Sequence, residues 1–379
     1  MKVAFITNIC PHYRVKTYET FARYIETDFF FFSASDEWYW QREHGVNSGD
    51  FRHEYLPGWR FGNTRFVPGL ITKLWQGNYD VYVKCVNGRF ALPVTYLIAR
   101  LKNRPFILWT GIWMRLQTPF HRLFYPVIRY IYRHADAIVV YGEHVKRFLE
   151  GEGVTSERIF VAAHAVDNDA YNCQVPQESK NVLYQKLGIG PEEKVILYLG
   201  RLEPVKGLTY LVDAFAKLCN RYDKRIILVI AGTGSDEHLL QKIVRDKGIS
   251  ECVRFVGYVP PNEAIIYYSI AWVYVLPSIT THNSKELWGL VINEAFNQGI
   301  PVITTDAVGA AAGGLVQDGV NGFIVPERDP VALAKQMTKL LNDRSMRMSF
   351  SKNALEIIRK WDNEAMVAGF QEAIDHVLQ

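Results

Sequence analysis

The sequence predicts an α/β protein of two domains, each built on a parallel β-sheet covered by helices. Short apolar runs with strand-like composition alternate with amphipathic helical stretches from end to end, which is typical of parallel sheets. A chain of 379 residues is long enough for two or three domains. A polar, turn-rich stretch at residues 167–192 divides the alternation into two halves and predicts an interdomain linker.

The first half contains six apolar runs with the length and composition of buried strands, at residues 2–7, 28–33, 79–84, 105–109, 136–141 and 158–161. Helical periodicity is found between them, at residues 14–26, 64–76, 90–102, 117–134 and 143–151. Residues 37–63 are rich in Trp and Gly and have weak periodicity, so we expect a loop or a short hairpin there.

The second half repeats this alternation. Strands are predicted at residues 195–200, 226–231, 253–256, 272–276, 302–304 and 322–325. Helices are predicted at residues 208–222, 236–248, 262–269, 290–298 and 330–342. Two further helices, near 346–359 and 363–378, have no strand after them, and we expect them to pack back across the linker onto the first domain.

The composition is that of an ordinary globular protein, with 49% hydrophobic and 22% charged residues. No apolar run approaches the roughly 20 residues that a membrane-spanning helix needs. The opening Met-Lys-Val-Ala-Phe-Ile-Thr is predicted to be a first strand and not a signal peptide. The five cysteines show neither pairing nor metal-ligand spacing, which favours a reducing cytoplasm.

Charge is distributed unevenly along the chain. The net charge is +4, and residues 1–175 alone carry 21 Lys and Arg against 16 Asp and Glu. No acidic residue lies between Asp80 and Asp136. The cations of this interval are Lys84, Arg89, Arg100, Lys102, Arg104, Arg115, Arg122, Arg129 and Arg133.

This basic segment, residues 84–133, could bind nucleic acid, bind an anionic membrane surface, or form a solvated face. Nucleic-acid binding is not expected, because nucleic-acid readers usually have a larger net charge and a recognisable module. Arg122, Arg129 and Arg133 fall near one face of the predicted helix, with aromatic and aliphatic residues between them. This pattern favours peripheral association with an anionic membrane.

Two glutamates bracket the start of one predicted helix in the second half. Glu286 lies in the loop after the strand at 272–276, and Glu294 lies in the early turns of the helix at 290–298. Backbone N–H groups at a helix start lack intrahelical partners, so a phosphate can bind them while a nearby carboxylate holds a sugar. The alternative is that both side chains only complement the positive end of the helix.

The loop after the strand at 195–200 is a second candidate site. It reads Gly200-Arg201-Leu-Glu-Pro-Val-Lys206-Gly207 and lies at the carboxyl end of its strand, where open α/β sheets bind ligands. Gly200 allows a close approach of the backbone to a ligand, and Arg201 and Lys206 supply two cations suited to a diphosphate. A solvated basic loop is the alternative.

Three other patterns are weaker. Gly232-Thr-Gly234 follows a strand but lacks the third glycine of a dinucleotide fingerprint, so a helix N-cap turn is predicted instead. The carboxylates at 167 and 169 have the spacing of a metal-binding pair, but no metal site is expected. His12 and Arg14 follow the first strand, where they could contact a phosphate or a hydroxyl; a structural role for His12 is the alternative.

Together these motifs resemble the retaining, nucleotide-sugar-dependent glycosyltransferases of glycosyltransferase family 4. Across residues 194–342 the resemblance is carried by Leu-Gly-Arg201-Leu-Glu-Pro-Val-Lys206-Gly-Leu, Val253-Arg-Phe-Val-Gly257-Tyr258-Val-Pro, Glu286-x7-Glu294-Ala, Gly-Ile-Pro-Val-Ile and Asp318-Gly-Val-Asn-Gly322-Phe-Ile-Val-Pro. In the first half it is weaker and rests on Pro11-His-Tyr-Arg14, Ala135-Asp-Ala-Ile-Val-Val and His164-Ala-Val-Asp167.

The resemblance implies the GT-B fold, in which two Rossmann-like parallel-sheet domains face each other across a cleft. Residues 1–170 would form the N-terminal, acceptor-side domain, and residues 190–358 the C-terminal domain that binds the nucleotide-sugar donor. Residues 359–379 would form a C-terminal helix that crosses back to the first domain.

The resemblance also implies roles for single residues. Arg201 and Lys206 would hold the donor diphosphate, Glu286 would bind the hydroxyls of the donor sugar, and these three would form the catalytic group. Glu294 would accept hydrogen bonds from the ribose. The other implied donor-binding residues are Gly200, Gly257, Tyr258, Gly289, Leu290 and Val291. The implied acceptor-side residues are His12, Arg14, Thr110, Gly111 and His164.

Three departures from the family pattern lie where the acceptor or the sugar would bind. The loop Trp109-Thr-Gly-Ile-Trp113 lacks a histidine that many members carry. His164-Ala-Val-Asp167 stands in place of the usual Asn-Gly-Val-Asp, and a common glutamate is missing from residues 308–314.

The implied activity is that of a metal-independent hexosyltransferase in the cytoplasm, associated with the inner face of the membrane. It would need no cofactor beyond its donor, a UDP- or GDP-sugar, and the acceptor would be a lipid-linked or cell-surface glycan. Two alternatives remain open: a nucleotide-sugar epimerase of the same fold, and a nucleotide-sugar-binding protein without turnover.

Overall fold

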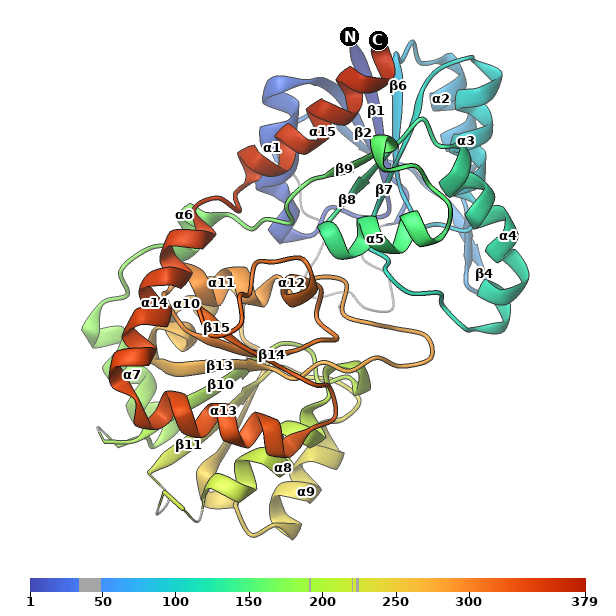
Figure 1. Ribbon diagram of the computed structural model, residues 1–379. Helices are drawn as coiled ribbons and strands as arrows, with labels where there is room; N and C mark the ends of the chain where they lie inside the picture. Colours follow the sequence, from blue (N-terminus) through green and yellow to red (C-terminus); the bar gives the residue numbers. More distant parts are fainter. Residues whose placement is uncertain (34–48, 191, 220, 223–224) are drawn as a thin grey trace. The chain divides into compact units, whose positions relative to one another are not determined.

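The computed structural model describes residues 1–33, 49–190, 192–219, 221–222 and 225–379, so residues 37–48 of the expected loop or hairpin lie outside the described residues. The chain divides into two compact units (Figure 1). The first unit comprises Met1–Arg115, Pro119–Asp167 and Asp362–Gln379, and the second Leu116–Thr118 and Asn168–Trp361. Each unit contains one parallel sheet with helices on both faces, which confirms the predicted fold class.

The sheet of the first unit has the strand order β3-β2-β1-β6-β7-β8-β9, and all its neighbours are parallel. Its strands are β1 (Lys2–Thr7), β2 (Glu26–Phe31), β3 (His53–Tyr55), β6 (Val81–Cys85), β7 (Phe106–Thr110), β8 (Ala137–Val140) and β9 (Ile159–Val161). Its helices are α1 (Val15–Tyr24), α2 (Pro68–Gln76), α3 (Ala91–Leu101), α4 (Pro119–His134), α5 (Glu143–Gly151) and α15 (Asn363–Leu378).

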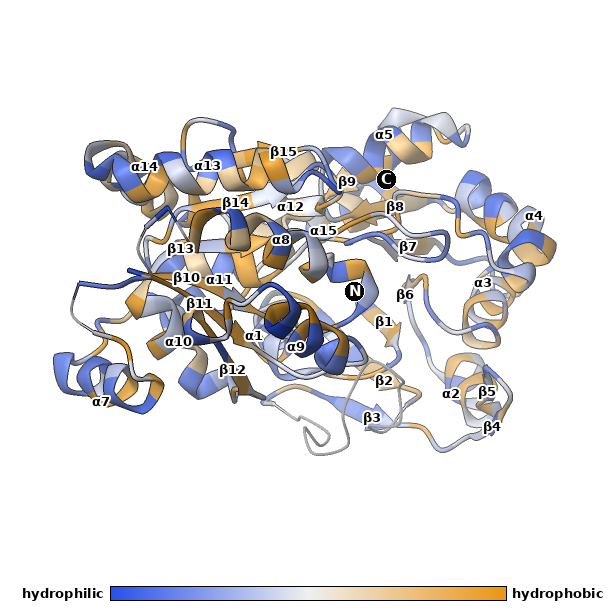
Figure 2. Cartoon of the chain, turned by 90° about the horizontal axis from the view of Figure 1, so that it is seen from below, coloured by the Kyte–Doolittle hydropathy of each residue, from blue (hydrophilic) through white to orange (hydrophobic). Residues whose placement is uncertain are grey.

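The strands of this sheet are apolar on both sides because helices cover both faces. Alternate residues of β1 illustrate this: Ala4 and Ile6 pack into one core with α2, α3, α4 and α5. Val3 and Phe5 pack into the other core with α1 and α15. Figure 2 shows the result, with hydrophobic strands and with helices that are hydrophobic on one side only.

The sheet of the second unit has the strand order β12-β11-β10-β13-β14-β15 and is also parallel throughout. Its strands are β10 (Lys194–Leu199), β11 (Ile226–Ala231), β12 (Val253–Gly257), β13 (Ala271–Leu276), β14 (Val302–Thr305) and β15 (Gly322–Val325). Its helices are α6 (Asn168–Tyr171), α7 (Gln177–Leu187), α8 (Leu208–Cys219), α9 (Glu237–Asp246), α10 (Pro261–Ile270), α11 (Val291–Asn297), α12 (Gly309–Ala312), α13 (Pro330–Asn342) and α14 (Arg344–Ile358).

The structure differs from the sequence-based expectation in several places, among them the following. The helix expected at 64–76 begins only at Pro68, a residue suited to the first helical turn, and residues 64–66 form β5, which pairs in antiparallel fashion with β4 (Trp59–Phe61). The expected linker contains α6 and α7, which belong to the second unit. Of the last two helices only α15 belongs to the first unit, since α14 packs on α11 and α13.

Helix α15 completes the core of the first unit, although it comes last in the chain. It packs against α1, β8 and β9. Phe370 contacts the rings of Phe5, Phe21 and Trp109, with centroid distances of 5.7, 5.4 and 5.6 Å. Near its start, the Thr17 hydroxyl of α1 donates a 2.6 Å hydrogen bond to Asn363 Oδ1.

Substitution of Phe370 tests this contribution. We expect Phe370→Ala to lower the free energy of unfolding by about 3–5 kcal/mol, because it removes a buried ring from a close-packed aromatic cluster. The matched control is Leu378→Ala on the same helix, where the side chain is exposed and the change should stay within about 0.5 kcal/mol. Urea denaturation measures both; equal losses for the two variants would contradict the assigned role of α15.

Candidate functional site

The predicted binding loops of the second unit meet at the carboxyl edge of its sheet. Gly200 follows β10, Gly232 follows β11 and Gly257 ends β12. The Gly200 N–H donates to the Ala231 carbonyl at 2.9 Å, and the Gly232 N–H donates to the Gly257 carbonyl at 2.7 Å. The loops therefore lie against one another in the position where α/β sheets bind ligands.

Gly232 and Gly234 allow these loops to pack closely, because neither glycine has a side chain. A Cβ on Gly232 would overlap the carbonyl of Gly200, and one on Gly234 would overlap Leu202. The Leu202 N–H donates to the Thr233 carbonyl at 2.9 Å. The turn leads into α9, as predicted.

A largely buried ion pair lies at this edge, with the Lys206 and Glu286 side chains 11% and 15% exposed. Lys206, the last residue of the 3-10 helix Pro204–Lys206, is buried, and its Nζ pairs with Glu286 Oε2. The Ser278 hydroxyl, which follows β13, donates to the same oxygen at 3.1 Å. Gly207 has φ +63° and lies so close to the Pro277 carbonyl that a Cβ would overlap it, so the Lys206 loop can adopt this position only with glycine there.

The charge state of Glu286 follows from these contacts. Burial alone would raise the pKa of the carboxyl, but the charge and hydrogen bond of Lys206, the charge of Arg201 and the Ser278 hydroxyl together lower the pKa below its ordinary value. Arg201 itself is exposed. The edge thus holds an ionised carboxylate, one buried cation and one exposed cation.

The pKa of Glu294 is shifted in the opposite direction to that of Glu286. It lies in α11, is buried, and accepts a 2.7 Å hydrogen bond from the Tyr268 hydroxyl. Burial raises the pKa of its carboxyl to about 7, and the hydrogen bonds from Tyr268 and Tyr171 offset only part of this shift. Glu294 therefore changes its protonation state near neutral pH.

The remaining predicted donor-side residues lie in the same loops. Gly289, with φ +91°, and Leu290, the N-cap residue, lead into α11 at Val291. Tyr258 follows Gly257 directly and is 45% exposed at the end of β12.

Sequence reasoning missed a side-chain network behind this edge. The Trp288 indole N–H donates to Asn293 Oδ1 at 2.9 Å, and the ring packs on Trp361 with a centroid distance of 5.1 Å. Asn297 Nδ2 donates to the Asn293 carbonyl at 3.0 Å and to Asn168 Oδ1 at 2.8 Å. The available signal was the pair of asparagines four positions apart in an apolar helix, where polar residues need buried partners.

Two of the predicted acceptor-side residues contact each other in the first unit. Arg14 Nη2 lies 2.7 Å from His164 Nδ1, and Arg14 Nη1 lies 3.2 Å from the Met366 sulfur of α15. Both side chains are buried, and His164 stacks on Tyr141 with a centroid distance of 3.8 Å. Burial, reinforced by Arg14 and His144, holds the pKa of His164 well below its ordinary value, so the ring is neutral.

The other three residues of that group are placed differently. Thr110 ends β7 and is buried, and its hydroxyl accepts a 3.2 Å hydrogen bond from the Ile112 N–H. Gly111 packs against the Tyr141 ring, and His12 is exposed.

Three arginines of the basic segment contact one acidic residue outside it, while Arg100 and Arg104 pair with Asp136 and Asp80. Glu152, at the end of α5, is buried and accepts a 2.6 Å hydrogen bond from Arg115 Nε. Arg129 Nε lies 3.2 Å from its second carboxylate oxygen, and Arg133 Nε donates to its backbone carbonyl at 2.8 Å. Arg129 and Arg133 both contact Glu152, yet Arg133 is exposed and Arg129 is partly exposed, so the expectation that they fall near one helix face with Arg122 stays a prediction.

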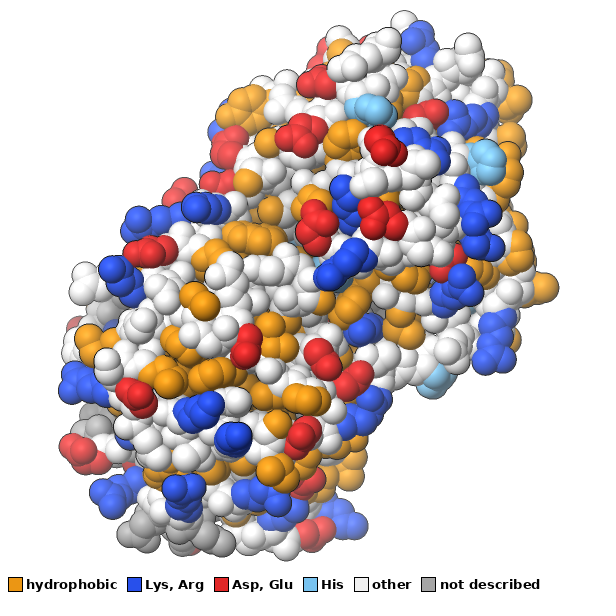
Figure 3. Space-filling view, in the orientation of Figure 1, with side chains coloured by type: hydrophobic (Ala, Val, Ile, Leu, Met, Phe, Trp, Pro, Cys, Tyr) orange, Lys and Arg blue, Asp and Glu red, His pale blue; other side chains and the backbone are white. Residues whose placement is uncertain are grey.

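The outer surface of α3 and α4 is instead mainly apolar. Helix α4 buries only Ile131 and Tyr132. Large exposed side chains of the two helices are Leu97, Leu101, Leu123, Phe124, Val127 and Tyr130. Figure 3 shows hydrophobic and basic side chains interleaved along the edge where α4 lies. Among the described residues, no helix is long and apolar enough to cross a membrane.

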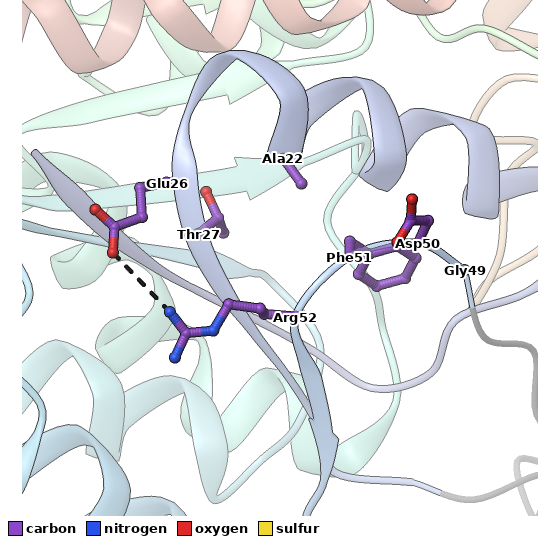
Figure 4. Close-up of a pocket in the computed structure, with 7 residues that line it drawn as sticks. All are labelled: Ala22, Glu26, Thr27, Gly49, Asp50, Phe51 and Arg52. Atoms are coloured by element: carbon purple, nitrogen blue, oxygen red, sulfur yellow. Dashed lines mark ion pairs between the residues drawn. The ribbon is translucent and has the colours of Figure 1, made fainter.

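A shallow pocket of about 450 Å³ lies elsewhere in the first unit (Figure 4). Its lining residues are Ala22, Glu26, Thr27, Gly49, Asp50, Phe51 and Arg52. Glu26 and Thr27 begin β2, so this pocket lies at the amino end of the strand, opposite the end where α/β sheets bind ligands. Among the described residues, no group of three or more His, Cys, Asp or Glu could hold a metal ion.

Comparison with known proteins shows which families the two units resemble. The family described as "Glycosyltransferase Family 4" matches residues 21–170, and the one described as "Glycosyl transferases group 1" matches residues 179–357. A D-inositol 3-phosphate glycosyltransferase of Corynebacterium urealyticum is 32% identical over 241 residues, which cover 61% of this chain and 55% of that protein. An alpha-D-kanosaminyltransferase of Streptomyces kanamyceticus is 25% identical over 283 residues, 72% of this chain and 71% of that protein. The chain thus spans about half the length of the inositol-phosphate relative that it matches.

Solved glycosyltransferase structures have the same overall fold as this chain. HepE of Anabaena in complex with UDP has a TM-score of 0.77 at 19% identity, and the match covers 99% of this chain and 100% of that one. Sucrose-phosphate synthase of Thermosynechococcus elongatus has a TM-score of 0.74 at 18% identity, with 100% and 99% covered.

The chain contains two Rossmann-like units. In one of them, cations, carboxylates and a helix start lie at the carboxyl edge of the sheet. This architecture is the GT-B fold. Residues 21–170 match the model of glycosyltransferase family 4 and residues 179–357 match the model of the group 1 glycosyl transferases, so both units resemble glycosyltransferase domains.

The raised pKa of Glu294 makes stability depend on pH. The folded state favours the protonated carboxyl up to about pH 7, whereas the unfolded chain ionises near the ordinary value of 4.5. Wild-type stability should therefore fall as pH rises from about 4.5 to 7 and then level off. Glu294→Gln stays neutral, so it should gain roughly 3 kcal/mol relative to wild type between pH 4.5 and pH 8. Urea denaturation at both pH values tests this, with exposed Glu263→Gln as the control; a pH-independent difference would refute the assignment.

Proposed function

We propose that this protein is a retaining glycosyltransferase that transfers a sugar from a UDP- or GDP-sugar to a glycan or lipid-linked acceptor. The observation that carries the proposal is the buried Lys206–Glu286 pair beside Arg201 at the carboxyl edge of the second sheet. Buried charges are costly unless they are paired, and a fold that retains such a pair at its ligand-binding edge is suited to bind a polar, charged ligand there.

Each part of the edge suits one part of a nucleotide sugar. Lys206 and Arg201 match the diphosphate, and the backbone amides of residues 289–291 add donors at the start of α11. Glu286 is ionised and can accept hydrogen bonds from sugar hydroxyls, while Glu294 can accept them from the ribose. Tyr258 is exposed beside Gly257, where it can flank the base. The family and the UDP complex of the structurally similar HepE support a nucleotide-sugar donor.

These groups account for catalysis without a metal. The bond between the anomeric carbon and the donor phosphate oxygen breaks, and the leaving diphosphate gains negative charge. Arg201, Lys206 and the amides stabilise that charge more strongly in the transition state than in the bound donor. The acceptor hydroxyl attacks from the face that the diphosphate leaves, which retains the configuration, and its proton passes to the departing phosphate oxygen.

Two other functions would use the same residues. An epimerase would consume the donor in the absence of an acceptor, and a binding protein would bind UDP or GDP without releasing it from the sugar. Arg14 and His164 are buried against each other, and this contact does not discriminate between these functions. Assays with donor alone and with donor plus acceptor separate the three functions.

The donor-site assignment predicts the effect of two substitutions. Lys206→Ala and Glu286→Gln should each lower kcat about 100- to 1,000-fold, since each removes a fixed electrostatic contact to the reacting groups. Lys247→Ala, which breaks a surface ion pair with Asp213 in the same unit, is the control and should retain full activity. Release of the nucleoside diphosphate measures all three; wild-type rates in either site variant would exclude this edge as the donor site.

We further propose that the protein is cytoplasmic and associates peripherally with the anionic inner face of the membrane through the basic segment, residues 84–133. The structure adds apolar contacts to the expected basic ones. The exposed apolar residues of α3 and α4 lie beside the exposed Arg122 and Arg133 and the partly exposed Arg129. Such a surface binds by burying apolar side chains at the headgroups and by attracting anionic lipid.

Vesicle binding tests the membrane proposal. Arg122→Gln should weaken binding to anionic vesicles about fivefold at low salt, with a smaller effect at high salt. Phe124→Asn should weaken binding at both salt concentrations, because it removes apolar burial. Val331→Asn, an exposed position on α13, is the control. A wild-type protein that fails to sediment with anionic vesicles at low salt would rule the proposal out.

A further inference from the structure

Two cysteine side chains of the second unit lie almost within bonding distance. Cys219 is the last residue of α8 and Cys252 is the last residue of the 3-10 helix Ser250–Cys252, which leads into β12. Both are buried, and their sulfur atoms are 2.7 Å apart although the residues are 33 positions apart in the chain. A disulfide bond is about 2.05 Å long, so bond formation needs a movement of only about 0.7 Å.

The sequence gives no sign of this pair, because neither spacing nor neighbouring residues resemble a disulfide or metal motif. The parallel sheet creates it: β12 pairs with β11, and the contacts of β11 with the helix before β12 bring Cys252 close to the end of α8. The other cysteines are placed differently. Cys10 and Cys85 are buried in the first unit, and Cys173 is exposed.

We propose that Cys219 and Cys252 form a redox-modification site, in which a hydroperoxide oxidises the two thiols to a disulfide. One thiolate attacks a peroxide oxygen, the O–O bond breaks, and a sulfenic acid and water result. The second thiol attacks the sulfenic sulfur, the S–O bond breaks, and a second water leaves. Two thiols and one hydrogen peroxide thus give one disulfide and two waters, and a dithiol reductant reverses the change.

The disulfide would connect the end of α8 to the start of β12. Gly257, at the other end of β12, lies at the ligand-binding edge, so the bond forms away from Lys206 and Glu286. The expected consequence is a more stable second unit with an unchanged active edge. Closure of a loop of 33 positions in the unfolded chain should raise Tm by roughly 5–10 °C. This inference does not depend on the proposed function.

The experiment uses the Cys173→Ser protein, which lacks the exposed cysteine and so avoids links between chains. The reduced protein is treated with hydrogen peroxide, alkylated under denaturing conditions and digested for mass spectrometry. We expect a mass loss of two hydrogens, a linked peptide pair containing Cys219 and Cys252, and the rise in Tm. Dithiothreitol should reverse all three, and the Cys173→Ser/Cys252→Ala protein should show none of them.

Three results would overturn the proposal. The four remaining cysteines could all stay alkylatable at a peroxide dose that oxidises Cys173 in the unsubstituted protein. Oxygen atoms could add to Cys219 or Cys252 without a link, or the link could involve Cys10 or Cys85. If the double variant does not fold, the peptide map of the single variant decides between these outcomes.

Discussion

The buried ion pair between Lys206 and Glu286 is the constraint on which the second unit depends most. Each of these ions would cost several kcal/mol to bury alone, so the fold must bring both to the same place with high precision. Two adjacent parallel strands achieve this: the Ile279 N–H after β13 donates to the Val205 carbonyl after β10 at 2.8 Å. Ser278 then supplies a hydrogen bond to the carboxylate. The pairing of β10 with β13 therefore determines where the Lys206 and Glu286 side chains meet.

Much of the fold could be predicted from sequence because the strands are buried on both faces. Runs such as Ile226–Ala231 are wholly apolar, and their boundaries agree with the structure. The failures have a common physical cause, which is weak local signal. Strands β3, β4 and β5 have three residues each and are stabilised by pairing with other strands. Helix α7 buries only Leu183 and Leu187, so its polar sequence was interpreted as a linker.

The structure brings the predicted site residues of the two units together in different ways. Arg201, Lys206 and Glu286 could be found because glycines and charges follow predicted strands, and strand ends converge in a parallel sheet. Arg14 and His164, predicted on the acceptor side, are buried and contact each other, which the sequence did not indicate. Sequence alone cannot distinguish these cases, because the burial of a polar side chain depends on partners distant in the chain. The Trp288–Asn293 network was missed for the same reason.

The position of α15 determines the order in which the chain can fold during its synthesis. The first unit emerges first, but one of its two cores stays open until Met366, Phe370 and Ile374 have been made. The second unit, apart from residues 116–118, is one continuous stretch ending at Trp361 and can reach its native state earlier. The nascent first unit therefore exposes a large aromatic surface while the ribosome translates the second. Transiently exposed apolar surface of this kind makes an incompletely folded chain prone to aggregation.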